Sequence, residues 1–582
     1  MLGRVSIAMD NSLYRSNKQG VGDWFKSGEP WIWVTASAVA VSVIAVVGLL
    51  LLLAVRGLGH FWPSDVLQFD YVDERSGELQ KIIGEVSASE EVSLEQLRSS
   101  GLQVSDAGGE LRQRDLIKTG NRDITGADFR WHLREAMSNI EKPDALLVLE
   151  RREWGNFYGY LLNVKQQGEL VAQQTAKVLD AKVWAEFEAR LNRALELHDE
   201  IKGIEKNQTK SLNYQLERLR LAERSLELQS ELGVRERTLE TARISEERAE
   251  INASYEVLQN TLSDLYARAQ RDSFTVLAAG GEQLEIPFAK VVHAMMPNQM
   301  NVVEKILAWF VKLGDFLSDD PREANTEGGV FPAIFGTVLM VILMAIMVTP
   351  FGVVAAVYLR EYARQGVITR TIRIAVNNLA GVPSIVYGVF GLGFFIYGIG
   401  EQVDHLLFEA ALPTPTFGTP GLLWASLTLA ILTVPVVIVA TEEGLARIPR
   451  SVREGSLALG ATKAETLWRV VLPMASPAMM TGLILAVARA AGEVAPLMLV
   501  GVVKLAPSLP VDGNYPYLHL DQKFMHLGFH IFDVGFQSPN VEAARPLVYA
   551  TALLLVIIIA LLNFSAVALR NHLRERYKAL DM

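Results

Sequence analysis

The sequence contains no cysteine among its 582 residues. Disulfide bridges and thiolate metal sites are therefore excluded. The Gly-x-x-x-x-Gly-Lys-Ser/Thr phosphate loop, the His-Glu-x-x-His metal motif and the Gly-x-Ser-x-Gly nucleophile elbow are also missing. The nine histidines are scattered and show no ligand spacing. We therefore expect no catalytic residue, no metal site and no cofactor bound by this chain.

Charge is unevenly distributed along the chain. Residues 61–328 hold 33 lysines and arginines against 47 acidic residues, whereas the remaining residues hold 22 against 18. An acidic insert thus lies between basic, apolar flanks. Nucleic-acid binding requires a basic surface that neutralises phosphates, so we expect no nucleic-acid partner. The basic residues beside apolar runs indicate membrane topology instead.

Long hydrophobic runs are the main positive feature of the sequence. A helix needs about 20 apolar residues to cross the hydrocarbon core of a bilayer. Residues 31–55 carry no charge and form a run too long for the apolar part of a signal peptide, which indicates an uncleaved anchor. Five further segments predict transmembrane helices, at about residues 331–358, 372–400, 422–441, 477–502 and 546–569.

Lysines and arginines beside these runs predict the orientation, because they favour the cytoplasmic side. They gather in four segments: Arg4, Arg15, Lys18 and Lys26; Arg360, Arg364, Arg370 and Arg373; Arg447, Arg450, Arg453, Lys463 and Arg469; and Arg570, Arg574, Arg576 and Lys578. Residues 401–421 contain neither residue type. This pattern predicts a multi-pass protein of the bacterial inner membrane with both termini cytoplasmic. The expected division is an N-terminal segment 1–30, a first helix 31–55, an insert 56–328 that is periplasmic from about residue 60, a core 329–576 with a cytoplasmic loop 442–476, and a tail 570–582.

The insert is predicted to be an α+β module that carries a helical hairpin at about residues 185–270. Residues 146–150, 157–164, 274–277 and 284–288 have the aromatic and β-branched content of strands, and Gly280-Gly281 predicts a turn between the last two. Heptad-like spacing predicts an apolar seam between the arms of the hairpin, formed by Leu212, Leu216, Leu219, Leu226, Ile251, Tyr255, Leu258, Leu262 and Leu265. Gly233 is the expected turn. A protein-docking arm and a structural spacer both remain open.

The segment after the fourth span has a characteristic spacing of small, acidic and proline residues. It reads Glu454-Gly455-Ser456, then Gly460, then Leu472-Pro473. Residues 451–459 predict a helix that ends in a left-handed turn at Gly460. Residues 464–471 predict a second helix, closed by Pro473. An amphipathic helix on the inner leaflet would also suit its arginines.

Two charges fall within the predicted fifth span. Arg489 and Glu493 are four residues apart, which places them on one face of a continuous helix. An ionised side chain in the membrane costs about 2.5–3.5 kcal/mol, and such residues usually mark a transport path. The planar fork of arginine matches the oxygens of a phosphate-like anion, and a carboxylate would accept a proton-bearing oxygen. A neutralised pair that merely packs helices is the alternative.

These motifs resemble those of ABC importer permeases. The segment 454–473 resembles their cytoplasmic "EAA" loop, with Gly-Ser in place of the commoner Ala-Ala. Arg-x-x-Gly-Glu-x-Ala-Pro at residues 489–496 and the stretch Gly381–Gly388 resemble the phosphate permeases of the PstA type. The likeness covers about residues 329–576, so nothing about the insert is carried over.

The resemblance implies an all-α polytopic protein with six transmembrane helices in the ABC type I importer permease fold, with the α+β insert between the first two. Glu454, Gly455, Ser456, Gly460, Leu472 and Pro473 would form the loop that couples to the ATPase. Arg489 and Glu493 would lie on the substrate path, and Gly381 and Pro383 would permit a helix break beside it.

The same resemblance implies the partners. They are a second permease of the PstC type, two copies of a PstB-type subunit that binds ATP and Mg, a periplasmic phosphate-binding protein of the PstS type, and membrane lipid. Import of sulfate, molybdate or phosphonate is the nearest alternative. A membrane sensor with a coiled-coil periplasmic domain is a further alternative.

Overall fold

The computed structural model describes residues 25, 27–73, 77–99, 110–175, 177–229, 233–538 and 541–578. Four of the basic residues that predicted the orientation, Arg4, Arg15, Lys18 and Lys26, lie outside this description. Within it, six helices are long and apolar enough to cross a membrane: Pro30–Gly59, Phe331–Tyr362, Ser384–Leu407, Leu422–Arg447, Lys463–Ala491 and Ala544–His572. They correspond to the six segments predicted from the sequence.

The third span begins later than predicted, because the chain breaks before Pro383. Residues 372–379 belong instead to a separate amphipathic helix, α10 (Val367–Leu379). The span itself consists of α11, a π-helical stretch and α12: Ser384–Phe390, Gly391–Gly400 and Glu401–Leu407. Proline lacks the N–H that a continuous helix would need at this point. The sixth span, within α19 (Val541–Lys578), extends past both predicted ends.

Three helices form the centre of the membrane bundle. α13 (Leu422–Arg447) packs against α9 (Phe331–Val357) and α16 (Leu472–Ala491), and its residues dominate the largest buried cluster. Small residues allow the close approach: a Cβ on Gly482 would lie 2.6 Å from the Cβ of Ala440. Small residues at helix contacts are typical of membrane bundles. The remaining short helices of this part are α14 (Arg450–Ala458), α15 (Lys463–Thr466), α17 (Leu497–Val500) and α18 (Leu527–Phe532).

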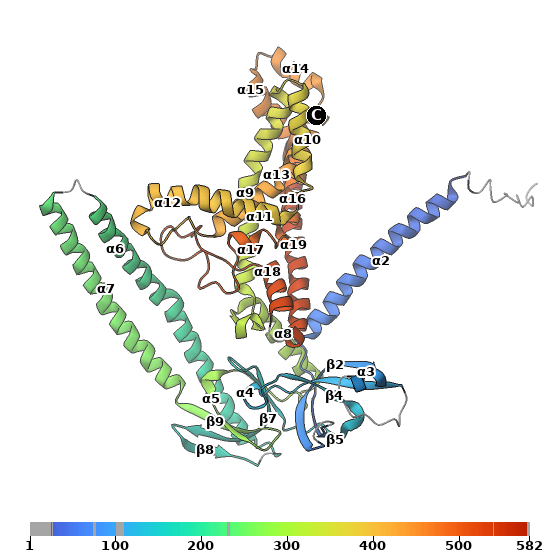
Figure 1. Cartoon of the computed structure of the whole chain (residues 1–582), viewed down its shortest axis with the longest axis vertical. Coiled ribbons are helices and arrows are strands. Elements are labelled where there is room, and N and C mark those ends of the chain that lie inside the picture. Colours follow the sequence, from blue (N-terminus) through green and yellow to red (C-terminus); the bar gives the residue numbers. More distant parts are fainter. Residues whose placement is uncertain are drawn as a thin grey trace, which may run out of the picture.

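The first span, α2 (Glu29–Gly59), diverges from this bundle (Figure 1). It contacts α19 near its C-terminal end, where a Cβ on Gly57 would lie 2.9 Å from the Cα of Ala550. None of its most apolar window is buried within the chain. Its apolar surface is therefore exposed along nearly its whole length.

The insert contains two large antiparallel sheets at the opposite end of the molecule from α14 and α15 (Figure 1), and a two-stranded sheet of β12 (Pro321–Arg322) and β13 (Glu327–Gly328). One large sheet has the order β4-β3-β2-β1-β5, and the other β10-β9-β7-β6-β11 with β8 paired to β7. The hydroxyl of Tyr160 donates to Gln68 Oε1 at 2.6 Å and joins the two sheets. The strand and short-helix bounds are β1 Val66–Val72, β2 Leu79–Ser93, α3 Leu94–Ser99, β3 Leu111–Lys118, α4 Arg122–Thr125, β4 Phe129–Leu133, β5 Met137–Glu141, β6 Leu147–Arg151, β7 Asn156–Gln166, β8 Glu169–Gln173, β9 Asp272–Leu277, β10 Gln283–Pro287 and β11 Val291–Met295.

The insert has more sheet than predicted, so an all-α description holds only for the membrane part. The four predicted strands match β6, β7, β9 and β10, and the turn between the last two lies at Gly280–Gly281 as expected. The whole first sheet was missed, as were β8 and β11. β2 reads LQKIIGEVSASEEVS, which has no aromatic residue and intersperses its β-branched residues with charged and small ones. Pairing with its neighbours, rather than local preference, makes it a strand.

The helical hairpin of the insert forms as predicted. One arm consists of α5 (Ala181–Gly203), a π-helical segment and α6 (Lys210–Leu228), and the other is α7 (Val234–Ala269), which begins directly after Gly233. All nine predicted seam residues are buried or half-buried. The seam leucines therefore hold the arms together.

The arm that contains α6 also touches the membrane part of the same chain. Lys210 Nζ lies 2.6 Å from Asp512 Oδ2, and His519 Nε2 lies 2.9 Å from the other oxygen of that carboxylate. Burial would raise the pKa of Asp512, but the hydrogen bonds from Lys210 and His519 hold it well below its usual value. The Tyr214 hydroxyl donates to the carbonyl of Tyr515. These contacts attach the hairpin to the loop between α17 and α18.

A half-buried ion pair connects the insert to α8 (Val302–Ser318), the helix that precedes the second span. Lys312 Nζ lies 2.5 Å from Glu150 Oε1, and both side chains are 19% exposed. Burial alone would raise the pKa of Glu150, but the charge of Lys312 lowers it to about 2. The pair therefore stays ionised at neutral pH.

We expect Lys312→Met to lower the free energy of unfolding of the insert by about 2 kcal/mol, because Glu150 would remain as a half-buried, unpaired carboxylate. Limited proteolysis of the full-length protein over a temperature series would measure this. Lys290→Met is the matched control, since Lys290 lies 3.3 Å from Glu153 at an exposed surface and such pairs contribute at most about 1 kcal/mol. Equal cleavage temperatures for the two variants would contradict the prediction.

Candidate functional site

Arg489 and Glu493 lie at a break in the fifth span. α16 ends at Ala491, residues 492–496 are not helical, and α17 begins at Leu497. The prediction of one helix over residues 477–502 is therefore wrong. Pro496 explains the end, because a proline ring clashes with the carbonyl of the residue four positions earlier, here Gly492. Arg489 occupies the last turn of α16, and Glu493 lies beyond it.

The two charged side chains are close but not tightly bonded. Arg489 Nε lies 3.7 Å from Glu493 Oε1, and the side chains are 32% and 20% exposed. A direct N–H···O hydrogen bond would bring these atoms to about 2.7–3.2 Å. The guanidinium thus keeps donors that an incoming anion can use, which a tightly closed structural pair would not offer.

The helix that follows the break in the third span packs against the break in the fifth. Gly381 donates its N–H to the carbonyl of Asn378, and Pro383 directly precedes α11. On α11, a Cβ on Gly388 would lie 2.7 Å from the Cα of Pro496. The structure thus places Gly381 and Pro383 directly before the helix that contacts the Glu493–Pro496 break.

Tyr387 belongs to this site but was not singled out in the sequence. Its hydroxyl donates to the carbonyl of Leu379 at 2.7 Å, which ties α11 back to α10 across the break. Arg489 lies within electrostatic reach of the same side chain. No local signal distinguishes Tyr387 from any other aromatic residue of an apolar run.

The loop after the fourth span forms a helix–turn–helix. α14 ends at Ala458, Gly460 has a φ of 89°, and α15 starts at Thr462 with a capping box that Glu465 completes. The predicted first helix and the left-handed turn at Gly460 are confirmed. Glu454 and Gly455 are exposed on α14, and the Ser456 hydroxyl lies 2.9 Å from that of Thr466 on α15.

The second helix of the loop does not close at Pro473 as predicted. A π-helical stretch, Leu467–Val471, continues directly into α16, of which Leu472 and Pro473 are the first residues. Proline is tolerated in the first turn of a helix, and a π-helical turn is a common place for a helix to deviate. α15, the π-helical stretch and α16 are therefore one continuous element, and Arg489 lies in its last turn.

Arg453 holds α14 against the membrane helices. Its guanidinium donates to Glu361 Oε1 at 2.9 Å and to the carbonyls of Leu445 and Ile448 at 2.8 and 2.7 Å. Lys463 Nζ donates to the Glu361 carbonyl at 2.5 Å. The sequence indicated Arg453 only as a topology marker, because its partner lies 92 residues away.

Large apolar side chains are exposed on this loop. Leu459, directly before Gly460, is 91% exposed, and Trp468, in the π-helical stretch after α15, is 74% exposed. Exposed apolar patches of this kind mark surfaces for protein or membrane contact. Among the described residues, no group of three or more histidines and acidic residues could hold a metal ion.

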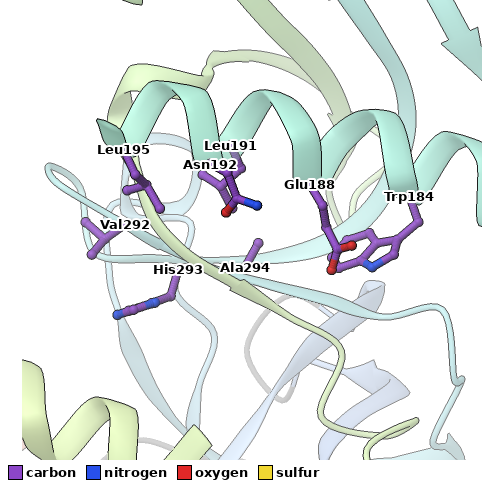
Figure 2. Close-up of a pocket in the computed structure, with 8 residues that line it drawn as sticks. All are labelled: Trp184, Glu188, Leu191, Asn192, Leu195, Val292, His293 and Ala294. Atoms are coloured by element: carbon purple, nitrogen blue, oxygen red, sulfur yellow. The ribbon is translucent and has the colours of Figure 1, made fainter. Parts of the chain in front are cut away.

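A pocket of about 210 Å³ lies in the insert, far from Arg489 in the chain. Figure 2 shows Trp184, Glu188 and Asn192 extending from α5 toward the strand that carries Val292, His293 and Ala294. Ligand pockets usually measure about 300–1,000 Å³. Burial would lower the pKa of His293, but its hydrogen bond to Asp315 raises it, so the ring is already engaged. The pocket therefore does not compete with the Arg489 region as the functional site.

Comparison with known proteins finds relatives for the second half of the chain. The profile of the family described as binding-protein-dependent transport system inner membrane component matches residues 348–579. The phosphate transport system permease protein PstA 1 of Mycobacterium tuberculosis (strain CDC 1551 / Oshkosh) is 33% identical over 247 residues, which cover 42% of this chain and 71% of that protein. PstA of Yersinia pestis is 30% identical over 258 residues, which cover 44% of this chain and 77% of that protein.

A third relative is the permease protein PstC of Xylella fastidiosa (strain 9a5c), 29% identical over 209 residues, which cover 34% of this chain and 64% of that protein. The range matched by the family profile includes the helix–turn–helix loop and both charged residues of the broken span. The chain therefore belongs to the inner-membrane permease components of binding-protein-dependent transport systems.

Proposed function

We propose that this chain is the permease subunit of an ATP-driven importer of inorganic phosphate. The observation that carries the proposal is the loose Arg489–Glu493 pair at the end of a broken membrane helix. Arginine stays charged and presents several donors to the oxygens of an anion. The relatives named PstA are phosphate permeases and favour the same substrate.

The carboxylate accounts for a preference among oxyanions. At neutral pH, hydrogen phosphate carries an O–H that can donate to Glu493 while its other oxygens accept from Arg489. Sulfate and molybdate carry acceptors only, so Glu493 would repel them. The sulfate and molybdate alternatives are therefore less favoured. A phosphonate can also carry an O–H, and against it the relatives named PstA favour phosphate. A membrane sensor is less favoured as well, because it needs neither six spans nor the loop.

Transport in this proposal follows an alternating-access cycle. The loop at Glu454, Gly455, Ser456 and Gly460 docks on a separate ATPase subunit, which binds ATP and Mg and carries out the hydrolysis. Since α15, Leu472, Pro473 and α16 are continuous, movement of the loop reaches Arg489 along one element. The breaks at Gly381–Pro383 and Gly492–Pro496 would let the site open to either side.

The proposed topology puts both termini, the loop 442–476 and the tail 570–582 in the cytoplasm, with the insert 56–328 in the periplasm. The sheets and the α14–α15 loop lie at opposite ends of the bundle (Figure 1), as this topology requires. The proposed complex contains a second permease of the PstC type, two PstB-type ATPases and a PstS-type periplasmic binding protein. The similarity to a PstC permease fits a pair of related pore subunits.

Uptake of radiolabelled phosphate and sulfate in the same cells tests the proposed function. The host should lack other phosphate importers, and it should carry or lack this chain together with its partner subunits. We expect phosphate uptake to depend on the chain and sulfate uptake to be unchanged. Phosphate uptake that is equal with and without the chain would refute the proposal.

A further inference from the structure

The helix α8 (Val302–Ser318) links the insert to the membrane bundle and is fastened on one side. Asn301 and Glu304 form a capping box at its start. Trp309 Nε1 donates to the carbonyl of Leu58 at 2.8 Å, close to the end of α2. Phe316 packs in a buried cluster with Phe61 and Val330. α8 is therefore held between the end of the first span and the start of the second.

Three of the four charged residues of α8 are engaged by the insert, and the fourth, Glu304, belongs to the capping box. Lys305 Nζ lies 2.6 Å from Asp65 Oδ1, and Asp315 Oδ2 lies 2.7 Å from His293 Nε2. Lys312 is paired with Glu150, as described above. The polar side of the helix is thus turned toward the insert, and its charges are neutralised there.

The opposite side of α8 exposes a continuous apolar stripe. Residues that recur every three to four positions lie on one face of a helix. Six large side chains at such positions are between 41% and 67% exposed: Val302, Val303, Ile306, Leu307, Phe310 and Val311. Nothing in the described chain covers this stripe, although it is as exposed as the apolar surface of α2.

The height of the stripe relative to the ends of the membrane spans indicates what covers it. The first span ends at Gly59 and the second begins at Phe331, and α8 contacts residues beside both ends. Figure 1 shows α8 where the long helices meet the sheets. An amphipathic helix at this level lies where lipid headgroups meet acyl chains. α8 also contacts the end of α2, whose own apolar side chains are exposed along nearly the whole helix.

We propose that α8 lies in the interfacial layer of the leaflet on the insert's side, with the stripe inserted among lipids. Leu307 and Phe310 then contact acyl chains, while Lys305, Lys312 and Asp315 face the insert. The helix anchors the insert at a fixed height and tilt above the bundle. This inference rests on the membrane spans and not on the identity of the transported anion.

The absence of native cysteine makes the test direct, since one cysteine introduced by substitution carries the only spin label. Leu307→Cys and Phe310→Cys place labels on the stripe, and Glu304→Cys places a label on the same helix outside it. Ile346→Cys on α9 and Val257→Cys on α7, at positions 64% and 67% exposed, serve as lipid and water references. Each full-length protein is reconstituted in liposomes, and label accessibility to oxygen and to a water-soluble nickel complex is measured.

We expect both stripe labels to follow the Ile346 reference, with oxygen access exceeding nickel access but at a shallower depth. The Glu304 label should follow the Val257 reference. Stripe labels as accessible to nickel as the Val257 label would overturn the proposal, because the stripe would then face water. Stripe labels inaccessible to both reagents would also overturn it, because a protein surface would then cover the helix.

Discussion

Replacing Arg489 by alanine is expected to lower phosphate uptake by about 100-fold, because a charge-assisted hydrogen bond contributes about 1.5–3 kcal/mol and the guanidinium can offer more than one. The side chain is 32% exposed and only loosely paired, so its loss should not unfold the bundle. Initial rates of radiolabelled phosphate uptake, divided by the membrane level of the protein, measure the effect.

Two further substitutions separate the roles of charge and shape at this position. Arg489→Lys keeps the charge but loses the planar fork, so we expect an intermediate rate. Leu485→Ala, one turn earlier on α16 and 55% exposed, is the matched control and should retain uptake. Normal phosphate uptake by Arg489→Ala, in cells with no second phosphate importer, would show that the pair is structural or that the substrate is another anion.

Local signals explain what was predicted correctly. The Gly460 turn and the helix before it depend on neighbouring residues alone, and the structure places the helix at Arg450–Ala458 against the predicted 451–459. The hairpin follows from its repeated leucines and Gly233. The starts of the second and fourth spans, at Phe331 and Leu422, also agree with the prediction.

Long-range contacts explain what was missed. The hydrophobicity of residues 477–502 predicted a continuous span, yet Gly492 and Pro496 are the residues that end the helix. Their effect on the site depends on Gly388, which belongs to a distant helix and leaves room for Pro496. The first sheet depends similarly on pairing between strands such as β2 and β3, whose own composition gives little strand signal. Composition predicts apolar length well, but it does not tell where two broken helices meet.

The contact of Arg453 with Glu361 likewise joins residues that are far apart in the chain. It leads to the second prediction with a large expected effect. Arg453 joins α14 to Glu361 and to two backbone carbonyls at the end of α13, so it links the loop directly to the bundle. Arg453→Ala removes these charge-assisted bonds, each worth about 1.5–3 kcal/mol, and leaves Glu361 without its guanidinium partner. We expect at least about a tenfold fall in phosphate transported per ATP hydrolysed.

The purified transporter in liposomes allows both rates to be measured on one sample, so a loss of coupling is distinguished from a loss of assembly. Arg450→Ala is the matched control, because Arg450 is exposed at the start of the same helix. Glu361→Gln should reproduce part of the Arg453→Ala effect, since it weakens the same contact from the other side. If Arg453→Ala and Arg450→Ala give the same ratio of transport to hydrolysis, the anchor does not carry the coupling, and movement must reach α16 through the continuous helix that follows Lys463.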